Sequence, residues 1–317
     1  MNHHPSDLLI GIDGGGSKTL ALLADAHGAI LGRGYGGCAN YQSVGFPAAA
    51  QALSDSIAAA FADAGASVQP VAALCMGIAG SDRPEDQSLY GDWAAAAWPG
   101  VPVSVVNDAQ LVLAAGTPDG AGVALIAGTG SIVYGRAPDG RLARAGGWGH
   151  VMGDEGSGYA VGQAALQAVM RAFDGRERPT RLTEAVLQHW RLSAPPDLVG
   201  QVYRSGMGPA EVASLAPLVH AAAEQGDAVA LDILAEAGRE LALAVAAVVE
   251  QLGLGQCSST GEVACGLAGG LIVNSPLLRA AFLDSVAERG VCLDPITLVT
   301  EPAQGAVRLA ERMLGKK

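Results

Sequence analysis

The sequence lacks the cysteine pattern of a metal-binding or disulfide-rich protein. None of its five cysteines belongs to a C-x-x-C pair, so neither a structural zinc site nor a disulfide framework is expected. Three of them, Cys75, Cys265 and Cys292, lie in or beside apolar, strand-like runs, where a reduced thiol behaves as a small hydrophobe. The other two, Cys38 and Cys257, stand outside such runs.

The sequence also lacks a long apolar run, a signal peptide and an excess of basic residues. The run Leu241–Val249 is much shorter than the roughly 20 apolar residues that span a bilayer. Residues 1–7 have neither the basic nor the apolar region of a signal peptide, so we expect no membrane association and a cytoplasmic location. A net charge of −12 argues against a nucleic-acid partner, but a nucleotide needs only a local electropositive pocket and a metal ion.

Apolar residues and glycine are abundant. A hydrophobic content of 50% over 317 residues suits two folded domains with buried cores. Glycines are densest between Gly146 and Gly158, where the backbone could approach a ligand while Trp148, His150 and Asp154 orient it. A helix is predicted from Gly156 onward, with Asp154 and Glu155 in its cap or first turn. The alternative for this stretch is a glycine-rich turn with an aromatic plug.

The chain opens with a predicted strand–turn–strand unit. Apolar runs Leu8–Asp13 and Leu20–Ala24 flank a glycine turn. The N–H groups of glycines 14 to 16 could face an anion, Ser17 and Thr19 could add hydroxyl donors, and Asp13 could hold magnesium. A P-loop is excluded, because Ser17 stands where its lysine should be and a strand follows instead of a helix. A plain tight hairpin is the alternative.

The first half reads as three strands followed by alternating helices and strands. After a third strand, Ala29–Arg33, the predicted elements are helix 47–64, strand 71–78, helix 84–98, strand 101–106 and helix 108–115. The hairpin pattern then returns, with strands 123–127, 132–136 and 142–145 and a Gly128–Ser131 turn. This repeat predicts two related halves that face each other, with a ligand between them.

The second half is predicted to be longer and more helical. Its expected helices are 157–173, 180–190, 198–204, 209–225 and 227–252, followed by strand 263–267, helix 277–289, strand 296–299 and a terminal helix from Pro302 to Leu314. The predicted domains are therefore residues 1–117 on the sugar and phosphate side, residues 118–301 on the nucleotide side, and residues 302–317 packing back on the first domain.

Two half-chains that each open with a glycine-turn hairpin resemble the superfamily of sugar kinases, heat-shock ATPases and actin. Within it, Ile12–Ser17, Gly128–Ser131 and Gly147–Ser157 resemble the N-acetylglucosamine kinase branch of the BadF/BadG/BcrA/BcrD ATPase family. The resemblance covers nearly the whole chain, and its most specific motif is Trp-Gly-His-x-x-Gly-Asp-Glu-Gly-Ser. It implies an α/β fold of two ribonuclease H-like, actin-like ATPase lobes, each a mixed sheet flanked by helices, with a cleft between them.

The resemblance also implies a division of labour among residues. Asp108 matches the catalytic base, whose alternative is a helix N-cap, and Asp13 lies near the metal. The residues matched to ATP binding are Gly14, Gly15, Gly16, Ser17, Lys18, Gly128, Thr129, Gly130, Gly269, Gly270 and Asn274. Those matched to the amino sugar are Asn40, Asp108, Ser131, Gly147, Trp148, Gly149, His150, Val151 and Asp154. His150 either bonds the substrate or braces the loop, and Trp148 is expected to be a packing residue.

The implied activity is transfer of the ATP γ-phosphate to the 6-hydroxyl of N-acetylglucosamine, with Mg²⁺ and in a homodimer. Phosphoryl transfer needs phosphate loops, a metal carboxylate and a second carboxylate at the acceptor hydroxyl, all of which the motifs provide. A glucosamine kinase is the nearest alternative. An iron–sulfur ATPase activator of acyl-CoA dehydratases would need cysteines placed for a cluster, and an actin-like scaffold would not need the polar loop at 147–155.

Overall fold

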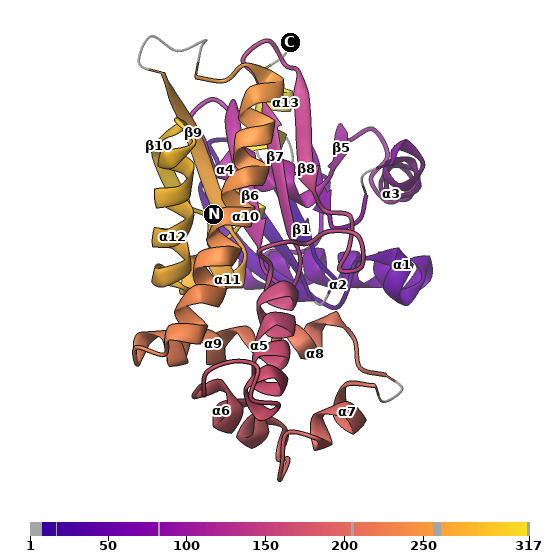
Figure 1. The fold of residues 1–317 in the computed structure, drawn as a ribbon. Helices are drawn as coiled ribbons and strands as arrows, with labels where there is room; N and C mark the ends of the chain where they lie inside the picture. The colour runs from indigo at the N-terminus through magenta and orange to yellow at the C-terminus, as the bar shows by residue number, and fades with distance from the viewer. Residues whose placement is uncertain (1–7, 17, 82, 204–205, 256–260, 316–317) are drawn as a thin grey trace. The chain divides into compact units, whose positions relative to one another are not determined.

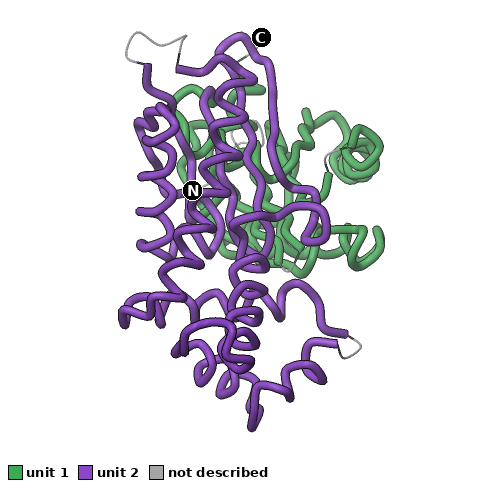
Figure 2. Tube along the Cα trace, viewed as in Figure 1, with its two compact units in different colours: residues 1–120, 301–317 green, residues 121–300 purple. Residues whose placement is uncertain are grey.

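The structure is a computed structural model that describes residues 8–16, 18–81, 83–203, 206–255 and 261–315. Figure 2 shows its two compact units. Unit 1 combines residues 1–120 with residues 301–317, and unit 2 is residues 121–300. Each unit is built around one five-stranded sheet.

The sheet of unit 1 has the strand order β3-β2-β1-β4-β5. Its strands are β1 (Leu8–Gly14), β2 (Thr19–Asp25), β3 (Ile30–Gly36), β4 (Ala73–Ile78) and β5 (Val103–Val106). The first three pair antiparallel as a meander, and β4 and β5 continue the sheet parallel to β1. β1 and β4 are almost wholly buried, as expected of central strands covered on both faces.

The helices of unit 1 are α1 (Tyr41–Val44), α2 (Phe46–Asp63), α3 (Pro84–Ala97), α4 (Asp108–Gly116) and α13 (Ala303–Leu314). Helix α2 lies so close to β3 that a Cβ on Gly34 would stand 2.0 Å from the Ser56 carbonyl oxygen. Helix α13 also lies close to β1, because a Cβ on Gly11 would stand 2.5 Å from the Val307 nitrogen. Glycines therefore set both helix-to-sheet distances.

The sheet of unit 2 has the order β10-β9-β6-β7-β8. Taken from the β8 edge, this order matches that of unit 1 strand for strand, with β6 in the central place of β1. Its strands are β6 (Gly122–Ala127), β7 (Ser131–Arg136), β8 (Leu142–Gly146), β9 (Glu262–Ala268) and β10 (Cys292–Leu298). Again the first three are an antiparallel meander and the last two are parallel additions. The predicted α/β fold of two related halves, each a mixed sheet flanked by helices, is confirmed.

Helices make up the rest of unit 2: α5 (Gly158–Phe173), α6 (Leu182–Trp190), α7 (Asp197–Val202), α8 (Pro209–Ala213), α9 (Ala216–Glu224), α10 (Ala228–Leu252), α11 (Gly270–Asn274) and α12 (Pro276–Glu288). Figure 1 shows α10 and α12 side by side along the sheet. Their backbones nearly touch at Gly238, where a Cβ would lie 2.8 Å from the Phe282 nitrogen. The core of the unit runs from β6, β7 and β9 through α10 to α5 and α9.

The structure corrects several expected elements. The single helix expected over 209–225 is interrupted at Ser214 and Leu215, and Pro217, in the first turn of the next helix, has no N–H with which to continue the first. The short helices α1 and α11 were not expected. Helix α5 is capped by Ser157, whose Oγ accepts from the Ala160 N–H, so the expectation that Asp154 and Glu155 belong to its cap or first turn is wrong.

The cysteines divide by exposure. Cys75 and Cys265 are buried in β4 and β9, and burial raises the pKa of each thiol to about 12, which makes both unreactive near neutral pH. Cys292 is exposed on β10, contrary to the expected apolar setting, and Cys257 lies outside the described residues. Within the described residues, no helix has both the length and the apolar character needed to cross a bilayer.

Candidate active site

One edge of the unit 1 sheet carries two carboxylates. Strands β1, β4 and β5 are parallel neighbours, so their carboxyl ends meet at this edge. Asp13 is the penultimate residue of β1, and Asp108 begins α4 directly after β5. The N-cap of α4 is Asn107, whose Oδ1 accepts from the Gln110 N–H at 3.1 Å. The alternative interpretation of Asp108 as this cap is therefore wrong.

The two carboxylates interact electrostatically. The pKa of Asp13 is raised from 3.8 to about 6, first by burial and then by the negative charge of Asp108, with a smaller opposing effect from the Lys18 ammonium. Two half-buried anions near one another favour protonation of one of them or binding of a cation. This edge therefore attracts positive charge although it belongs to an acidic protein.

The chemistry of these groups suits magnesium carried by a substrate. Among the described residues, no group of three or more His, Cys, Asp or Glu side chains is arranged to hold a metal ion. Mg²⁺ commonly takes one or two protein carboxylates and fills its remaining positions with water and phosphate oxygens. Burial disfavours the ionised form of Asp13, and a bound cation would favour it. Asp13 is therefore suited to be the protein carboxylate of such a site.

The first glycine turn is less open than the sequence suggested. The Gly15 N–H donates to the Lys18 carbonyl at 3.0 Å, and the Thr19 hydroxyl donates to the Gly37 carbonyl at 2.7 Å. The expectation that both face an anion is therefore wrong. A Cβ on Gly16 would meet no atom within 4 Å, so Gly16 and the exposed Lys18 remain open toward a ligand. Ser17 lies outside the described residues.

Asn40 lies at the same edge of the sheet. The Ala39 N–H donates to the Gly15 carbonyl at 3.1 Å, which ties this loop to the glycine turn. Asn40 caps α1: its Oδ1 accepts from the Gln42 N–H at 3.0 Å. Its Nδ2 points at Gly80, where an added Cβ would lie 3.2 Å away. With the oxygen used by the cap, the amide N–H₂ is the part of Asn40 that can donate to a ligand.

The second glycine loop, in unit 2, borders a pocket of about 480 Å³. The Gly158 and Tyr159 N–H groups donate to the Gly128 and Thr129 carbonyls at 2.7 and 3.1 Å, which fixes the loop on the start of α5. The pocket brings together four of the predicted nucleotide residues, Gly128, Thr129, Gly270 and Asn274. Other residues lining it were not predicted, among them Pro217, His220 and Ser275.

Gly269 serves this pocket indirectly. It does not line the pocket, and a Cβ at this position would lie 2.4 Å from the Ala127 carbonyl oxygen. Its φ of +93° is also one that side-chain-bearing residues rarely adopt. Gly269 therefore allows β9 to turn sharply into α11, which presents Gly270 and Asn274 to the pocket.

Asp154 and Ser131 form a connected pair beside the second glycine loop. The Ser131 N–H donates to Asp154 Oδ1 at 3.3 Å, and the Ser131 hydroxyl donates to the Glu155 carbonyl at 2.7 Å. Asp154 has a φ of +62°, and a Cβ on Gly130 would stand 2.9 Å from its Oδ2. Burial raises the pKa of Asp154, while the bond from Ser131 opposes that rise. The Asp154 carboxylate is thus buried, and the Ser131 N–H holds it in one orientation.

The loop from Gly147 to Met152 is largely exposed. Trp148 is 59% exposed, so the alternative of a turn with an aromatic core plug is wrong, and the Arg144 guanidinium lies 4.1 Å from the centre of its ring. Val151 is 84% exposed. The His150 ring lies 4.9 Å from that of Tyr159, which favours a bracing role. Positive φ angles of Gly147 and Gly149 shape this loop.

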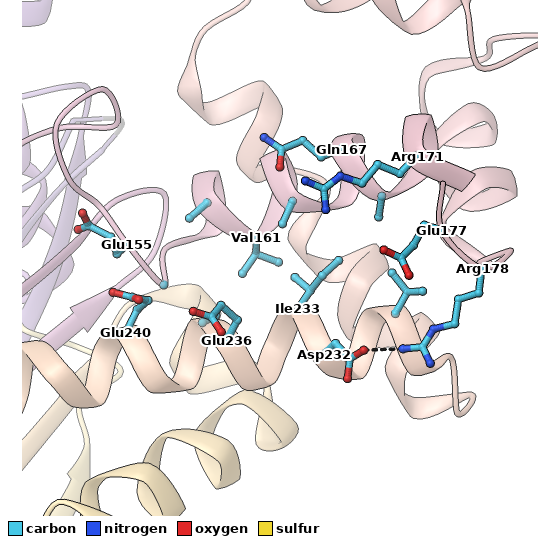
Figure 3. A pocket seen from close by; sticks show the side chains of 16 residues that line it. Glu155, Val161, Gln167, Arg171, Glu177, Arg178, Asp232, Ile233, Glu236 and Glu240 are labelled. Atoms are coloured by element: carbon cyan, nitrogen blue, oxygen red, sulfur yellow. Dashed lines mark hydrogen bonds and ion pairs between the residues drawn. The ribbon is translucent and has the colours of Figure 1, made fainter. Parts of the chain in front are cut away.

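A second pocket of unit 2, of about 470 Å³, lies between α5 and α10 (Figure 3). Its apolar floor is flanked at one end by the carboxylates of Glu155, Glu236 and Glu240. At the other end Arg178 forms an ion pair with Asp232. Three carboxylates repel a polyphosphate, so the pocket beside the second glycine loop suits a nucleotide better.

Comparisons with known proteins agree over nearly the whole chain. The BadF/BadG/BcrA/BcrD ATPase family matches residues 10–310. A Clostridium acetobutylicum protein named N-acetylmuramic acid/N-acetylglucosamine kinase is 38% identical over 302 residues, 95% of this chain and 97% of that protein. A Dictyostelium discoideum N-acetyl-D-glucosamine kinase is 31% identical over 314 residues, 96% of this chain and 98% of that protein. The crystal structure of a Chromobacterium violaceum protein, proposed to be an N-acetylglucosamine kinase, is similar with a TM-score of 0.77 and 30% identity, covering 97% of this chain and 100% of that one.

Proposed function

The chain belongs to the BadF/BadG/BcrA/BcrD ATPase family, and we propose that it is an ATP-dependent kinase that phosphorylates the 6-hydroxyl of N-acetylglucosamine. The observation that carries the proposal is the pair of interacting carboxylates, Asp13 and Asp108, on one sheet edge. Phosphoryl transfer depends on positioning and charge stabilisation, so it needs one carboxylate for a metal and one for the acceptor hydroxyl.

Asp108 is the catalytic base in this proposal. Its carboxylate accepts a hydrogen bond from the sugar 6-hydroxyl, orients that oxygen for in-line attack on the γ-phosphorus, and receives the proton as the new O–P bond forms. Asp13 is the residue that would hold Mg²⁺, and the ion would supply positive charge to stabilise the transferred phosphoryl group. The family resemblance assigns the exposed Lys18 and the open Gly16 to the ATP phosphates.

The family resemblance also assigns nucleotide and sugar residues to unit 2. Adenosine and the α- and β-phosphates occupy the pocket lined by Gly128, Thr129, Gly270 and Asn274. Asp154, held by Ser131, accepts hydrogen bonds from sugar hydroxyls, and the Gly147–Val151 loop covers the sugar. Asn40 donates its amide to the same substrate. A homodimeric state and a cytoplasmic location are further parts of this proposal that depend on the family resemblance.

N-acetylmuramic acid is a second candidate substrate, because the Clostridium acetobutylicum relative is named for it. This sugar carries a carboxylate that N-acetylglucosamine lacks. Arg144, stacked on the exposed Trp148, places a cation beside the proposed sugar loop and could attract that carboxylate.

The test is sugar-dependent ADP release with Mg²⁺ and ATP. N-acetylglucosamine, N-acetylmuramic acid and glucosamine are compared side by side, and the phosphorylated position is found by phosphorus–proton correlation NMR. We expect 6-phosphorylation of N-acetylglucosamine with the highest kcat/KM. ATP hydrolysis that no sugar accelerates would refute a kinase and favour a scaffold or an ATPase activator, and a preference for glucosamine would replace the proposed substrate.

A further inference from the structure

A tyrosine buried beneath the Asn40 loop contacts both neighbours of Asn40. Tyr90, on α3, is fully buried. Its hydroxyl donates to the Ala39 carbonyl at 2.5 Å and accepts from the Tyr41 N–H at 3.1 Å. Asn40 is the residue between these two partners, so one side-chain oxygen fixes the backbone on both sides of it.

A second contact from α3 supports the same loop. The Tyr41 hydroxyl donates to Asp86 Oδ1 at 2.5 Å, and Asp86 is only 5% exposed. Asp86 and Tyr90 stand four residues apart and therefore share one face of the helix. The rings of Tyr41 and Phe46 meet Tyr90 edge to face, with centroids 6.1 and 5.6 Å away. Helix α3 thus holds this loop by three hydrogen bonds, made by two of its side chains within an aromatic cluster.

We propose that Asp86 and Tyr90, here named the α3 clamp, position Asn40 for binding the amino sugar, although neither contacts the substrate. The inference depends on the proposed role of Asn40. Packing alone does not account for the Tyr90 hydroxyl, because phenylalanine would fill the same apolar space. A buried hydroxyl is costly unless it is hydrogen-bonded, and this one uses its donor and an acceptor site on a single short loop.

The clamp determines where the Asn40 amide points. The Asn40 oxygen is occupied by the Gln42 N–H, so the side chain turns as a unit with the start of α1. A shift of Ala39 or Tyr41 therefore moves the amide N–H₂ away from its place at Gly80. A displaced donor weakens a substrate hydrogen bond without altering groups elsewhere in the site.

The test is Tyr90→Phe, which removes one oxygen and leaves the Ala39 carbonyl and the Tyr41 N–H without this partner. We expect the KM for N-acetylglucosamine to rise by about tenfold, the scale of losing the one hydrogen bond from Asn40 to the sugar. The KM for ATP should stay within about twofold of the wild-type value. The control is Ser56→Ala in the same unit, which removes a buried hydroxyl that donates to Leu53, away from Asn40. It should lower thermal stability without changing the KM for the sugar.

A second variant covers the case in which Tyr90→Phe does not fold. Tyr41→Phe removes the contact with Asp86 and leaves Tyr90 in place, and it should raise the KM for the sugar several-fold. If folded Tyr90→Phe or folded Tyr41→Phe keeps the wild-type KM for the sugar, or raises the KM for ATP as much as the KM for the sugar, the α3 clamp is only structural and the inference is overturned.

A double-mutant cycle separates this inference from the proposed function. Asn40→Asp keeps the cap oxygen and removes the N–H₂ donor. If Tyr90 acts through Asn40, adding Tyr90→Phe to Asn40→Asp should cost much less than it costs in the wild type. Additive effects would overturn the clamp alone. An unchanged KM for the sugar in Asn40→Asp would instead refute the assignment of Asn40 to the sugar, and the clamp would fall with it.

Discussion

Replacing Asp13 with asparagine should make the metal-free protein more stable at neutral pH. The Asp13 pKa is about 6 in the folded state and 3.8 as the unperturbed value. Between these two values the folded state binds more protons than the unfolded state, so the free energy of unfolding falls as pH rises. The stability that the protonated carboxyl provides is complete below about pH 4 and lost above about pH 6.

The size of this effect follows from the pKa difference. At 1.36 kcal/mol for each pKa unit, a rise of about two units corresponds to about 3 kcal/mol. Asp13→Asn removes this component because the amide does not titrate. The free energy of unfolding of the variant, relative to that of the wild type, should therefore rise by up to about 3 kcal/mol between pH 4 and pH 7. Part of the gain depends on Asp108, so Asp108→Asn should flatten the wild-type pH dependence less than Asp13→Asn does.

The assay is urea unfolding at pH 4.5, 5.5, 6.5 and 7.5 in EDTA, compared with an Asp55→Asn control on the exposed face of α2. The control should follow the wild-type pH dependence. Added Mg²⁺ and ATP should stabilise the wild type more than Asp13→Asn at pH 7.5, because the ionised carboxylate binds the cation. If the free energies of unfolding of the wild type and of Asp13→Asn change with pH in the same way, the raised pKa of Asp13 and the preference of this edge for a cation are both refuted.

Three further variants test individual side chains. Asp108→Asn should lower kcat by about 10²–10⁴ without lowering thermal stability, since Asn107 caps α4; wild-type turnover would exclude Asp108 as the base. Asp154→Ala should weaken sugar binding by about one to two orders of magnitude, as expected for a charged hydrogen bond, and isothermal titration should show ATP binding nearly unchanged. Gly130→Ala should also raise the KM for the sugar, because its Cβ would displace the Asp154 carboxylate, and it should add little in an Asp154→Ala background.

Local patterns in the sequence were sufficient for the two meanders. Each has a short apolar strand, a glycine turn and a second apolar strand, and these signals depend on neighbouring residues alone. The positions of Asp13 and Asp108 at strand ends followed from the same patterns. That their charges interact could not be predicted from spacing, because it depends on β4 lying between β1 and β5.

Hydrogen-bond partners were the least predictable feature. Asn107 and Ser157, not the neighbouring acidic residues, cap their helices, because the choice depends on backbone angles such as the positive φ of Asp154. The Thr19 hydroxyl donates a hydrogen bond to the carbonyl of Gly37, 18 residues further along the chain. His220 on α9 and Ser275 at the N-cap of α12 bond one another at 3.0 Å in the lining of the proposed nucleotide pocket, and neither carried a local signal for that place.

The packing of α13 on β1 has a consequence for synthesis. Strand β1 is made long before its partner helix, which begins at Ala303, so at roughly 5–20 residues per second about 15–60 s pass before the helix exists. Unit 2 is one continuous stretch and can fold during that interval. The apolar surface around Leu9, Leu22 and Cys75 must wait for α13 to cover it. Unit 1 is thus begun before unit 2 and completed after it, and this apolar surface stays uncovered in the interval.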